Sequence, residues 1–150
     1  MVVTASLHRT FMEGRSCKRG MPVRPLREGE VPFYNRILAD SDMDGLFGAA
    51  VLKAYRPEAK VHFTHAAAMR SGIVDELVDR QTALVDLPFH PECGWYVDHH
   101  MTNRPDDEQA TVFAASGGTQ HWEATPSAAR LAYDLLVDIK IGRASCRERV

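Results

Sequence analysis

Acidic residues and histidines follow several short apolar runs of this sequence, at the points where predicted strands end. These residues are Asp40, Asp42, Asp44, Asp86, Asp98, His99 and His100. If the runs are strands of one parallel sheet, their carboxyl ends meet at one edge, and the side chains converge on one crevice. Crowded carboxylates raise one another's pKa values, and a divalent cation relieves the repulsion. Oxygen ligands with a few imidazoles suit Mn²⁺ or Mg²⁺ better than a metal that prefers thiolates.

Such a cluster can support phosphoryl chemistry. Two cations bridged by one carboxylate would clamp a phosphate group: one ion lowers the pKa of the attacking water, and both stabilise the charge that grows on the phosphate oxygens. The residue types therefore favour a site for one or two divalent cations, Mn²⁺ or Mg²⁺, that is suited to chemistry on a phosphorylated substrate.

Simpler interpretations exist for each part of the pattern. The run Asp40-Ser41-Asp42-Met43-Asp44-Gly45 also opens like an EF-hand calcium loop. That loop needs Glu at its twelfth position, where this chain has Val51, and an entering helix, where the pattern predicts a strand. A lone Asp after a strand is usually a turn former, and adjacent histidines are often exposed loop residues. The combination of the aspartate run, Asp86 and the adjacent histidines is what favours a metal centre.

The elements that must position these residues alternate in type. Strands are expected at 34–39, 60–64, 82–86, 94–98 and 111–114, and helices at 46–55, 73–79 and 126–139, the last with Thr125 as N-cap. Residues 116–119 (Ser-Gly-Gly-Thr) read as a loop. This alternation predicts an α/β fold, a doubly wound and mostly parallel sheet with helices on both faces.

Smaller candidates surround the same crevice. His65, His90 and Arg70 follow predicted strands and could line it, although a solvated Arg70 is the simpler interpretation. Cys93 and Tyr96 are expected in the core.

The two ends of the chain differ from its middle. Residues 1–32 mix Arg, Gly and Pro without a period and are expected to be an unstructured or spurious extension. Residues 141–150 read IGRASCRERV, which is what a common sequencing-adapter sequence encodes in translation, so we expect a tail that is foreign to the fold. The domain itself is expected at 33–140, incomplete at its C-terminus.

Composition narrows the function classes. The chain has 150 residues, 45% of them hydrophobic, and 18 basic against 20 acidic side chains, a net charge of −2. This balance excludes a globally basic surface for nucleic acid, but not a local patch. No apolar run reaches the about 18 residues of a membrane helix. Three scattered cysteines give no disulfide or zinc framework, so a cytoplasmic protein without a membrane partner is expected.

Together, the motifs Asp42-x-Asp44-Gly45, Asp86 and Asp98-His99-His100 resemble the DHH phosphoesterase superfamily, in order and in spacing, over residues 35–140. A later helix that contains Pro126-Ser127-Ala128-Ala129-Arg130-Leu131 fits as well. Members of the superfamily include RecJ-type single-strand exonucleases, phosphodiesterases of nanoRNA, linear dinucleotides and cyclic dinucleotides, exopolyphosphatases and family II inorganic pyrophosphatases. The resemblance implies a hydrolase of phosphodiester or phosphoanhydride bonds that depends on two Mn²⁺ ions.

The resemblance also implies a role for each residue. Asp42 and Asp44 would each bind one ion, Asp86 would bridge both, and His99 would bind the second. His100 would contact the substrate phosphate, and Asp98 would orient the neighbouring imidazole. Asp40 stands where many members have His, as in RecJ-like Asp-x-Asp-x-Asp-Gly sequences, and this favours the nuclease branch and a metal-binding role for Asp40.

Two expected parts of the family pattern have no counterpart in this sequence: a fourth acidic ligand after the last helix and a smaller substrate-binding domain. Nucleotides, short single-stranded oligonucleotides and polyphosphate or pyrophosphate therefore remain open as substrates, and the oligomeric state is not indicated. The alternative from a different class is a non-catalytic domain that binds a divalent cation. The plainest alternative is an α/β domain with acidic loops and no metal.

Overall fold

The computed structural model describes residues 23–139. Its strands are β1 (Arg36–Asp40), β2 (Lys60–Thr64), β3 (Thr82–Val85), β4 (Trp95–Asp98) and β5 (Thr119–Trp122). Its α-helices are α1 (Met43–Tyr55), α2 (Ala66–Arg70), α3 (Asp107–Ala115) and α4 (Ala128–Leu136), and two short 3₁₀ helices are η1 (Glu28–Glu30) and η2 (Asp75–Leu77). None of the helices in this described range has the length and apolar character that a bilayer span requires.

All five strands run parallel in one sheet, in the order β2-β1-β3-β4-β5. The chain leaves β1 for β2 on one side and then returns to place β3 on the other side of β1. The strand order therefore reverses between β1 and β3, and ligands of open α/β sheets bind beyond the carboxyl ends of the strands at this point.

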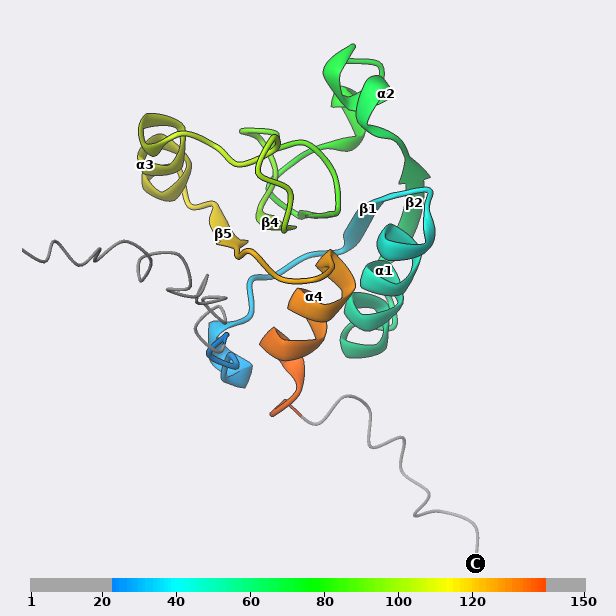
Figure 1. Ribbon diagram of the computed structural model, residues 1–150, viewed down its shortest axis with the longest axis vertical. Helices are drawn as coiled ribbons and strands as arrows, with labels where there is room; N and C mark the ends of the chain where they lie inside the picture. The colour runs from blue at the N-terminus through cyan, green and yellow to red at the C-terminus, as the bar shows by residue number, and fades with distance from the viewer. Residues whose placement is uncertain (1–22, 140–150) are drawn as a thin grey trace, which may run out of the picture.

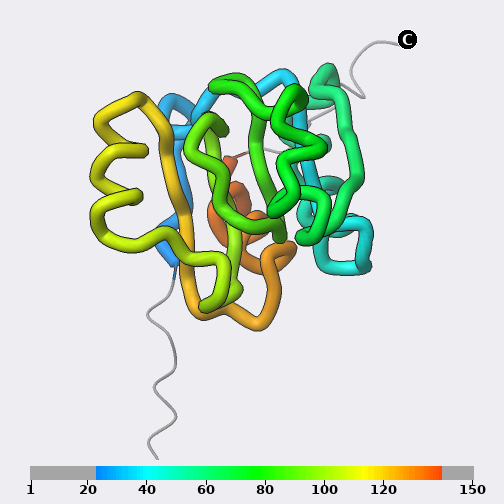
Figure 2. The backbone as a smooth tube through the Cα atoms, turned by 90° about the horizontal axis from the view of Figure 1, so that it is seen from above, coloured from blue at the N-terminus to red at the C-terminus, as the bar shows by residue number. Residues whose placement is uncertain are grey.

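Alternate residues of the strands point to opposite faces of the sheet and belong to two hydrophobic cores, one on each face. Ile37 and Ala39 of β1 belong to the core under α1 and α4, whereas Leu38 belongs to the core that contains Met69 of α2 and Phe113 of α3. The same alternation continues through β3 and β4. In Figures 1 and 2, α3 and α1 lie at opposite sides of the molecule, and Figure 1 shows α4 beside α1. The prediction of a doubly wound α/β fold is confirmed.

The strand expected at 111–114 is wrong, because these residues lie inside α3. Asp106 caps this helix: its carboxylate accepts a hydrogen bond from the backbone N–H of Gln109 at 2.7 Å, and the side chain of Gln109 accepts one from the backbone N–H of Asp106 at 3.0 Å. A reciprocal capping box of this kind starts a helix even where β-branched residues follow. Val112 is 61% exposed, so the apolar run there does not mark a buried strand.

The loop expected at 116–119 is present at residues 116–118, but its last residue, Thr119, begins β5, a strand that the sequence pattern missed. Gly117 has a φ of +87°, which few other residue types tolerate, and this turn ends α3 and starts β5. The strand escaped prediction because it is short and lies at the edge of the sheet, with His121 and Trp122 only half buried.

The helix expected at 73–79 is also wrong. The α-helix of this region is α2, and Gly72, with a φ of +74°, follows its C-cap Ser71. Beyond that glycine the chain forms only the single 3₁₀ turn η2. The N-cap of α4 is Ser127 rather than Thr125: the Ser127 side chain accepts the backbone N–H of Arg130 at 3.0 Å.

The expectation of an unstructured segment up to residue 32 fails for residues 23–32. Leu26 is 6% exposed and is part of the core under α1 and α4. Its backbone N–H donates a hydrogen bond of 2.8 Å to the carbonyl oxygen of Leu135, so this segment packs against α4. Residues 1–22 and the expected foreign tail, 141–150, lie outside the described residues.

Candidate functional site

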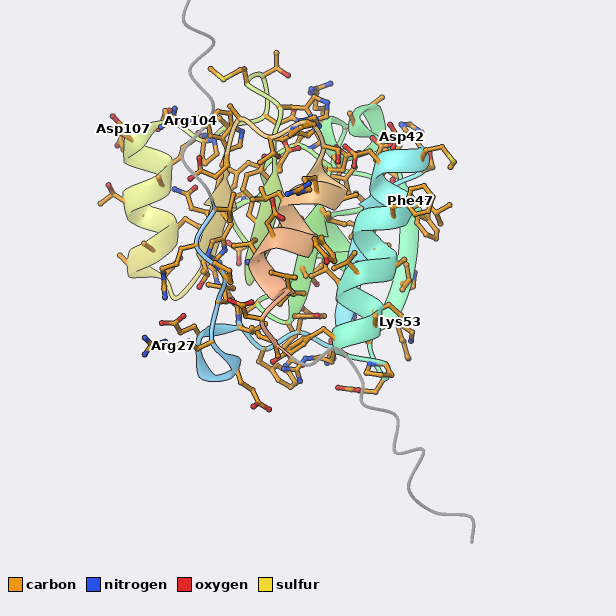
Figure 3. All side chains as sticks on the ribbon, turned by 60° about the horizontal axis from the view of Figure 1, so that its bottom comes forward. Arg27, Asp42, Phe47, Lys53, Arg104 and Asp107 are labelled. Atoms are coloured by element: carbon orange, nitrogen blue, oxygen red, sulfur yellow. The ribbon has the colours of Figure 1, made fainter. Side chains whose placement is uncertain are left out.

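The predicted site residues lie at the carboxyl edge of the sheet. Asp40 ends β1 and Asp98 ends β4, while Asp86 directly follows β3. Asp42 and Asp44 lie at the start of α1, which follows β1. Figure 3 shows Asp42 and Arg104 at one edge of the molecule, with Lys53 and Arg27 at the opposite edge. The site therefore lies beside the reversal of strand order.

Asp86 is the most unusual residue of this edge. It is 3% exposed and has a φ of +61°, a left-handed conformation that costs energy for any residue with a side chain. Its buried Oδ1 has no hydrogen-bond partner among the described residues. Burial, followed by the negative charges of Asp44, Asp42 and Asp98, raises the pKa of Asp86 to about 8. A strained, buried carboxyl whose Oδ1 accepts no hydrogen bond, with only the imidazoles of His100 and His99 nearby at 3.4 and 3.7 Å, indicates a place that a cation could fill.

His99 is oriented by the backbone. Its Nδ1 lies 3.1 Å from the carbonyl oxygen of Thr125, which can only accept, so Nδ1 carries the proton. Nε2, the other ring nitrogen, faces the carboxylates and lies 3.2 Å from Asp44 Oδ2 and 3.7 Å from Asp86 Oδ1. This is the arrangement in which a metal-binding histidine donates its other ring N–H to a carbonyl.

His100 is oriented by a carboxylate instead. Its Nδ1 lies 3.0 Å from Oδ1 of the fully buried Asp98, and 3.4 Å from Asp86 Oδ1. Burial by itself lowers the pKa of His100, but its hydrogen bond to Asp98 and the surrounding carboxylate charges raise it above its ordinary value. The second oxygen of Asp98 accepts a hydrogen bond of 2.9 Å from the hydroxyl of Tyr96.

The donor set fits a divalent cation. One ligand atom from each of Asp86, Asp98, His99 and His100 lies within 4.8 Å of the others. The Oδ1 of Asp86, which accepts no hydrogen bond, and the Nε2 of His99, which faces Asp44 and Asp86, are the atoms that a cation would bind. Carboxylate and imidazole groups without a thiolate suit Mn²⁺ or Mg²⁺.

Asp44 adjoins this group and also joins two helices. Its Oδ2 accepts the backbone N–H of Ala128 at 2.9 Å, and its Oδ1 accepts that of Ala129 at 2.8 Å. Asp44 thus lies against the positive end of α4, where a carboxylate is stabilised by the unpaired amides of the first turn. Each oxygen keeps a second lone pair, and Asp44 Oδ2 lies closest to His99.

Asp42 and Asp40 occupy the rim. Asp42 is exposed and caps α1, because its Oδ1 accepts the backbone N–H of Gly45 at 2.9 Å. Asp40 is half buried, and among the described residues its carboxylate forms no hydrogen bond or ion pair. Gly45 packs so closely on this turn that a Cβ there would collide with the carbonyl oxygen of Asp40. The glycine of the motif is therefore required by contact with the backbone.

The remaining candidates from the sequence have other partners. His65 caps α2 by accepting the backbone N–H of Ala68 at 3.2 Å, and His90 lies 3.5 Å from Asp75. Arg70 donates to the side chain of Asn103 at 3.2 Å, in the loop that follows His100. Cys93 is fully buried, as expected. The structure does not bring these side chains into the metal-ligand group.

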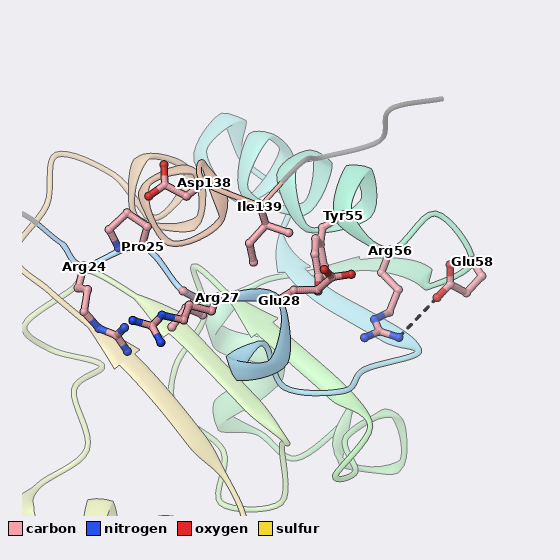
Figure 4. A pocket seen from close by; sticks show the side chains of 10 residues that line it. Arg24, Pro25, Arg27, Glu28, Tyr55, Arg56, Glu58, Asp138 and Ile139 are labelled. Atoms are coloured by element: carbon pink, nitrogen blue, oxygen red, sulfur yellow. Dashed lines mark ion pairs between the residues drawn. The ribbon is translucent and has the colours of Figure 1, made fainter. Parts of the chain in front are cut away.

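A cavity of about 1010 Å³ lies elsewhere, between the segment before β1 and the ends of α1 and α4 (Figure 4). No predicted site residue lines it. Its charged lining residues balance in sign and are Arg24, Arg27, Arg56, Glu28, Glu58 and Asp138. The cavity thus offers no preference for a charged ligand.

Two contributors to the site escape the sequence pattern. The pattern places Tyr96 in the core, but its hydroxyl bonds to Asp98, and Thr125 supplies the carbonyl that orients His99. The sequence does hold a signal for Tyr96: residues two apart in a strand share a face, so Tyr96 has to lie beside Asp98. It holds none for Thr125, since the contact is made by its backbone across 26 residues.

Similarity to known proteins is limited to solved structures. No protein-family model matches this chain, and neither does any curated protein. Among solved structures, the pGpG-specific phosphodiesterase PggH from Vibrio cholerae is similar, with 26% sequence identity and a TM-score of 0.46. The match covers 67% of this chain and only 29% of that one. A TM-score of this size is too low to establish a shared fold, so the functional argument rests on the geometry of the site.

Proposed function

We propose that this chain is a metal-dependent phosphoesterase of the DHH type, a hydrolase of phosphodiester or phosphoanhydride bonds. Its preferred substrates in this proposal are single-stranded nucleic acid and short oligonucleotides or dinucleotides. The observation that carries the proposal is the buried Oδ1 of Asp86, which accepts no hydrogen bond and faces His99 and His100 at the point where the strand order reverses.

The residues of the site divide into two groups. Asp86, His99, Asp44 and Asp42 would hold two Mn²⁺ ions, with Asp40 at the rim. Bound there, the ions would activate water and neutralise charge on a phosphate group.

The second group consists of His100, which would contact the substrate, and Asp98, which orients it. Thr125 and Asp98 fix the protonated nitrogens of His99 and His100, so that Nε2 of each ring is available to a ligand. The raised pKa of His100 favours its cationic form, which attracts a phosphate oxygen. Asp98 remains bound to His100 and Tyr96 and acts by orienting the imidazole.

The test is a hydrolysis assay of the 150-residue chain with a linear dinucleotide, a short single-stranded oligonucleotide, pyrophosphate and polyphosphate. Each substrate is tested with Mn²⁺, with Mg²⁺ and with a chelator. We expect hydrolysis with Mn²⁺ that is fastest on the dinucleotide or oligonucleotide and absent with the chelator. Asp86→Asn should bind Mn²⁺ at least about 10-fold more weakly in calorimetry and lose hydrolysis, because it removes the bridging charge.

The matched control is Asp107→Asn, an exposed acidic residue of α3 away from the ligand group, which should keep both properties. Hydrolysis that survives Asp86→Asn would refute the site. Mn²⁺ binding by the wild type without hydrolysis of any substrate would favour the non-catalytic cation-binding domain. Preference for pyrophosphate or polyphosphate would keep the mechanism but replace the substrate class.

A further inference from the structure

Beyond the candidate ligands, we propose that Tyr96 and Trp122 are positioning residues that clamp His100, the residue assigned to the substrate phosphate. The inference rests on the proposed function for the role of His100. It concerns two side chains that the metal motif does not include, and it rests on four hydrogen bonds around one short turn.

The first part of the clamp is the Tyr96 hydroxyl. It lies 2.9 Å from Asp98 Oδ2 and also 2.9 Å from the carbonyl oxygen of Asn103. These two acceptors bracket the segment that contains His99 and His100. Tyr96 itself is fully buried in β4, so its hydroxyl has a fixed position from which to join both ends of the turn.

The Tyr96 hydroxyl has a single proton to share between these acceptors. The Asp98 carboxylate is the stronger acceptor because it is charged. With Oδ2 held by Tyr96, Oδ1 of Asp98 remains directed at Nδ1 of His100, 3.0 Å away. The phenol, the carboxylate and the imidazole therefore form a continuous chain of hydrogen bonds that ends at His100 Nε2.

Trp122 supplies the second part. Its indole N–H donates a hydrogen bond of 2.9 Å to the carbonyl oxygen of His100, and Trp122 pairs in register with Asp98 across β4 and β5. The guanidinium of Arg104 lies 4.8 Å from the centre of the Trp122 ring and covers it. His100 is thereby held at its ring through Asp98 and at its backbone through Trp122, although its side chain is 47% exposed.

This clamp has a functional rationale. An exposed imidazole that must meet a phosphate loses rate when it samples several orientations, since catalysis needs the reacting groups held in place. Removing either contact should therefore impair His100 while leaving Asp86 and His99 unaffected, because neither Tyr96 nor Trp122 bonds to these residues.

The experiment uses Tyr96→Phe and Trp122→Phe in the 150-residue chain, with Tyr133→Phe as control because Tyr133 is 48% exposed on α4. We expect both clamp variants to lower kcat/KM for the dinucleotide by about 10- to 100-fold, the usual effect of losing a residue that supports a ligand. Mn²⁺ affinity measured by calorimetry should stay within about twofold of wild type. In a His100→Gln background, the same two substitutions should cause no further loss of kcat/KM.

A second readout does not need activity. In ¹⁵N-labelled protein, the Nδ1–H proton of His100 should exchange slowly with solvent in wild type and in Tyr133→Phe. It should exchange faster in Tyr96→Phe and in Trp122→Phe, because the turn is no longer held. Using two variants guards against one of them failing to fold.

The outcomes separate the two proposals. If the wild type hydrolyses nothing but the exchange of His100 Nδ1–H responds as expected, the proposed function fails and the clamp stands. Unchanged exchange in both clamp variants overturns the clamp whatever the activity. Equal losses of kcat/KM in the wild-type and His100→Gln backgrounds also overturn it, because the effect would then be a general structural one.

Discussion

At the scale of the residue, Asp86 is the site residue whose conformation and burial cost the most free energy on folding. Its φ of +61°, its burial and its unpaired Oδ1 all oppose the folding of an ionised carboxylate at this position. A bound cation would offset these costs, because its positive charge attracts the crowded carboxylates and reduces their mutual repulsion. Gly72 also has a positive φ, but it lies in a turn and has no side chain. Asp86 has a positive φ and an ionisable side chain.

The charge of Asp86 leads to a prediction on pH. Its pKa is about 8 in the metal-free fold against an ordinary value of 3.8, so between these values the folded state holds a proton that the unfolded state has released. Stability of the metal-free protein must therefore fall as pH rises from about 6.5 through about 8. Urea unfolding in the presence of a chelator, at several values across about pH 6.5 to 8.5, measures this decline.

Asp86→Asn should flatten this decline, because an amide has no proton to lose and Asn tolerates the left-handed backbone. Part of the slope stays, since the raised pKa of His100 acts in the same direction. Asp107→Asn should keep the whole slope. An equal slope in wild type and Asp86→Asn would show that Asp86 ionises normally in the fold.

At the scale of the element, the site depends on how α1 and α4 begin. Asp42 caps α1 from within the motif, so helix formation and ligand placement use the same residue. Asp44 connects α1 to the first turn of α4 through two backbone amides. The two helices cannot shift relative to each other without moving a candidate ligand.

This connection predicts the effect of Asp44→Asn. The variant keeps one acceptor oxygen but turns an NH₂ group toward a backbone N–H of α4, which leaves that amide unsatisfied. Stability should fall by about 1–3 kcal/mol, measured by urea unfolding without metal. Asp134→Asn, on α4 itself, is the control: Asp134 forms an ion pair with the exposed Arg130, and its loss should cost under about 1 kcal/mol. Equal stability of the two variants would contradict the cap.

At the scale of the whole molecule, the order of the strands assembles the site. Because β3 lies between β1 and β4, the carboxyl ends of these three strands are neighbours, and Asp40, Asp86 and Asp98 come to one edge although 58 residues separate the first from the last. The segment before β1 packs against α4 through Leu26, which is part of the core under α1 and α4. Residues 23–32 therefore belong to the fold.

The packing of this segment can be measured directly. Leu26→Ala should lower the free energy of unfolding by about 2–5 kcal/mol, because it leaves a cavity in the core under α1 and α4. Ile73→Ala, at a side chain that is 79% exposed, should change it by less than about 0.5 kcal/mol. If Leu26→Ala were as harmless as Ile73→Ala, the segment would not be packed in solution.

The sequence by itself determined the fold class and the edge at which the acids gather. Alternating apolar residues and strand-to-acid junctions are local patterns, and parallel strands then bring their ends together for geometric reasons. Thus local patterns alone suffice to group Asp86, Asp98, His99 and His100, and the ligand atoms of these four residues lie within 4.8 Å of one another in the fold. That they bind a metal, and the role of each, remain predictions.

Only the tertiary structure decided how these residues are held. The bonds from Asp44 to Ala128 and Ala129, from Thr125 to His99, and from Trp122 to His100 join segments 22 to 85 residues apart. The same holds for β5, whose short half-buried edge strand carries a weak local signal, and for Leu26, whose place in the core depends on α4. Contacts between distant segments leave no periodicity in the sequence, since their partners are set by how the whole sheet and its helices pack.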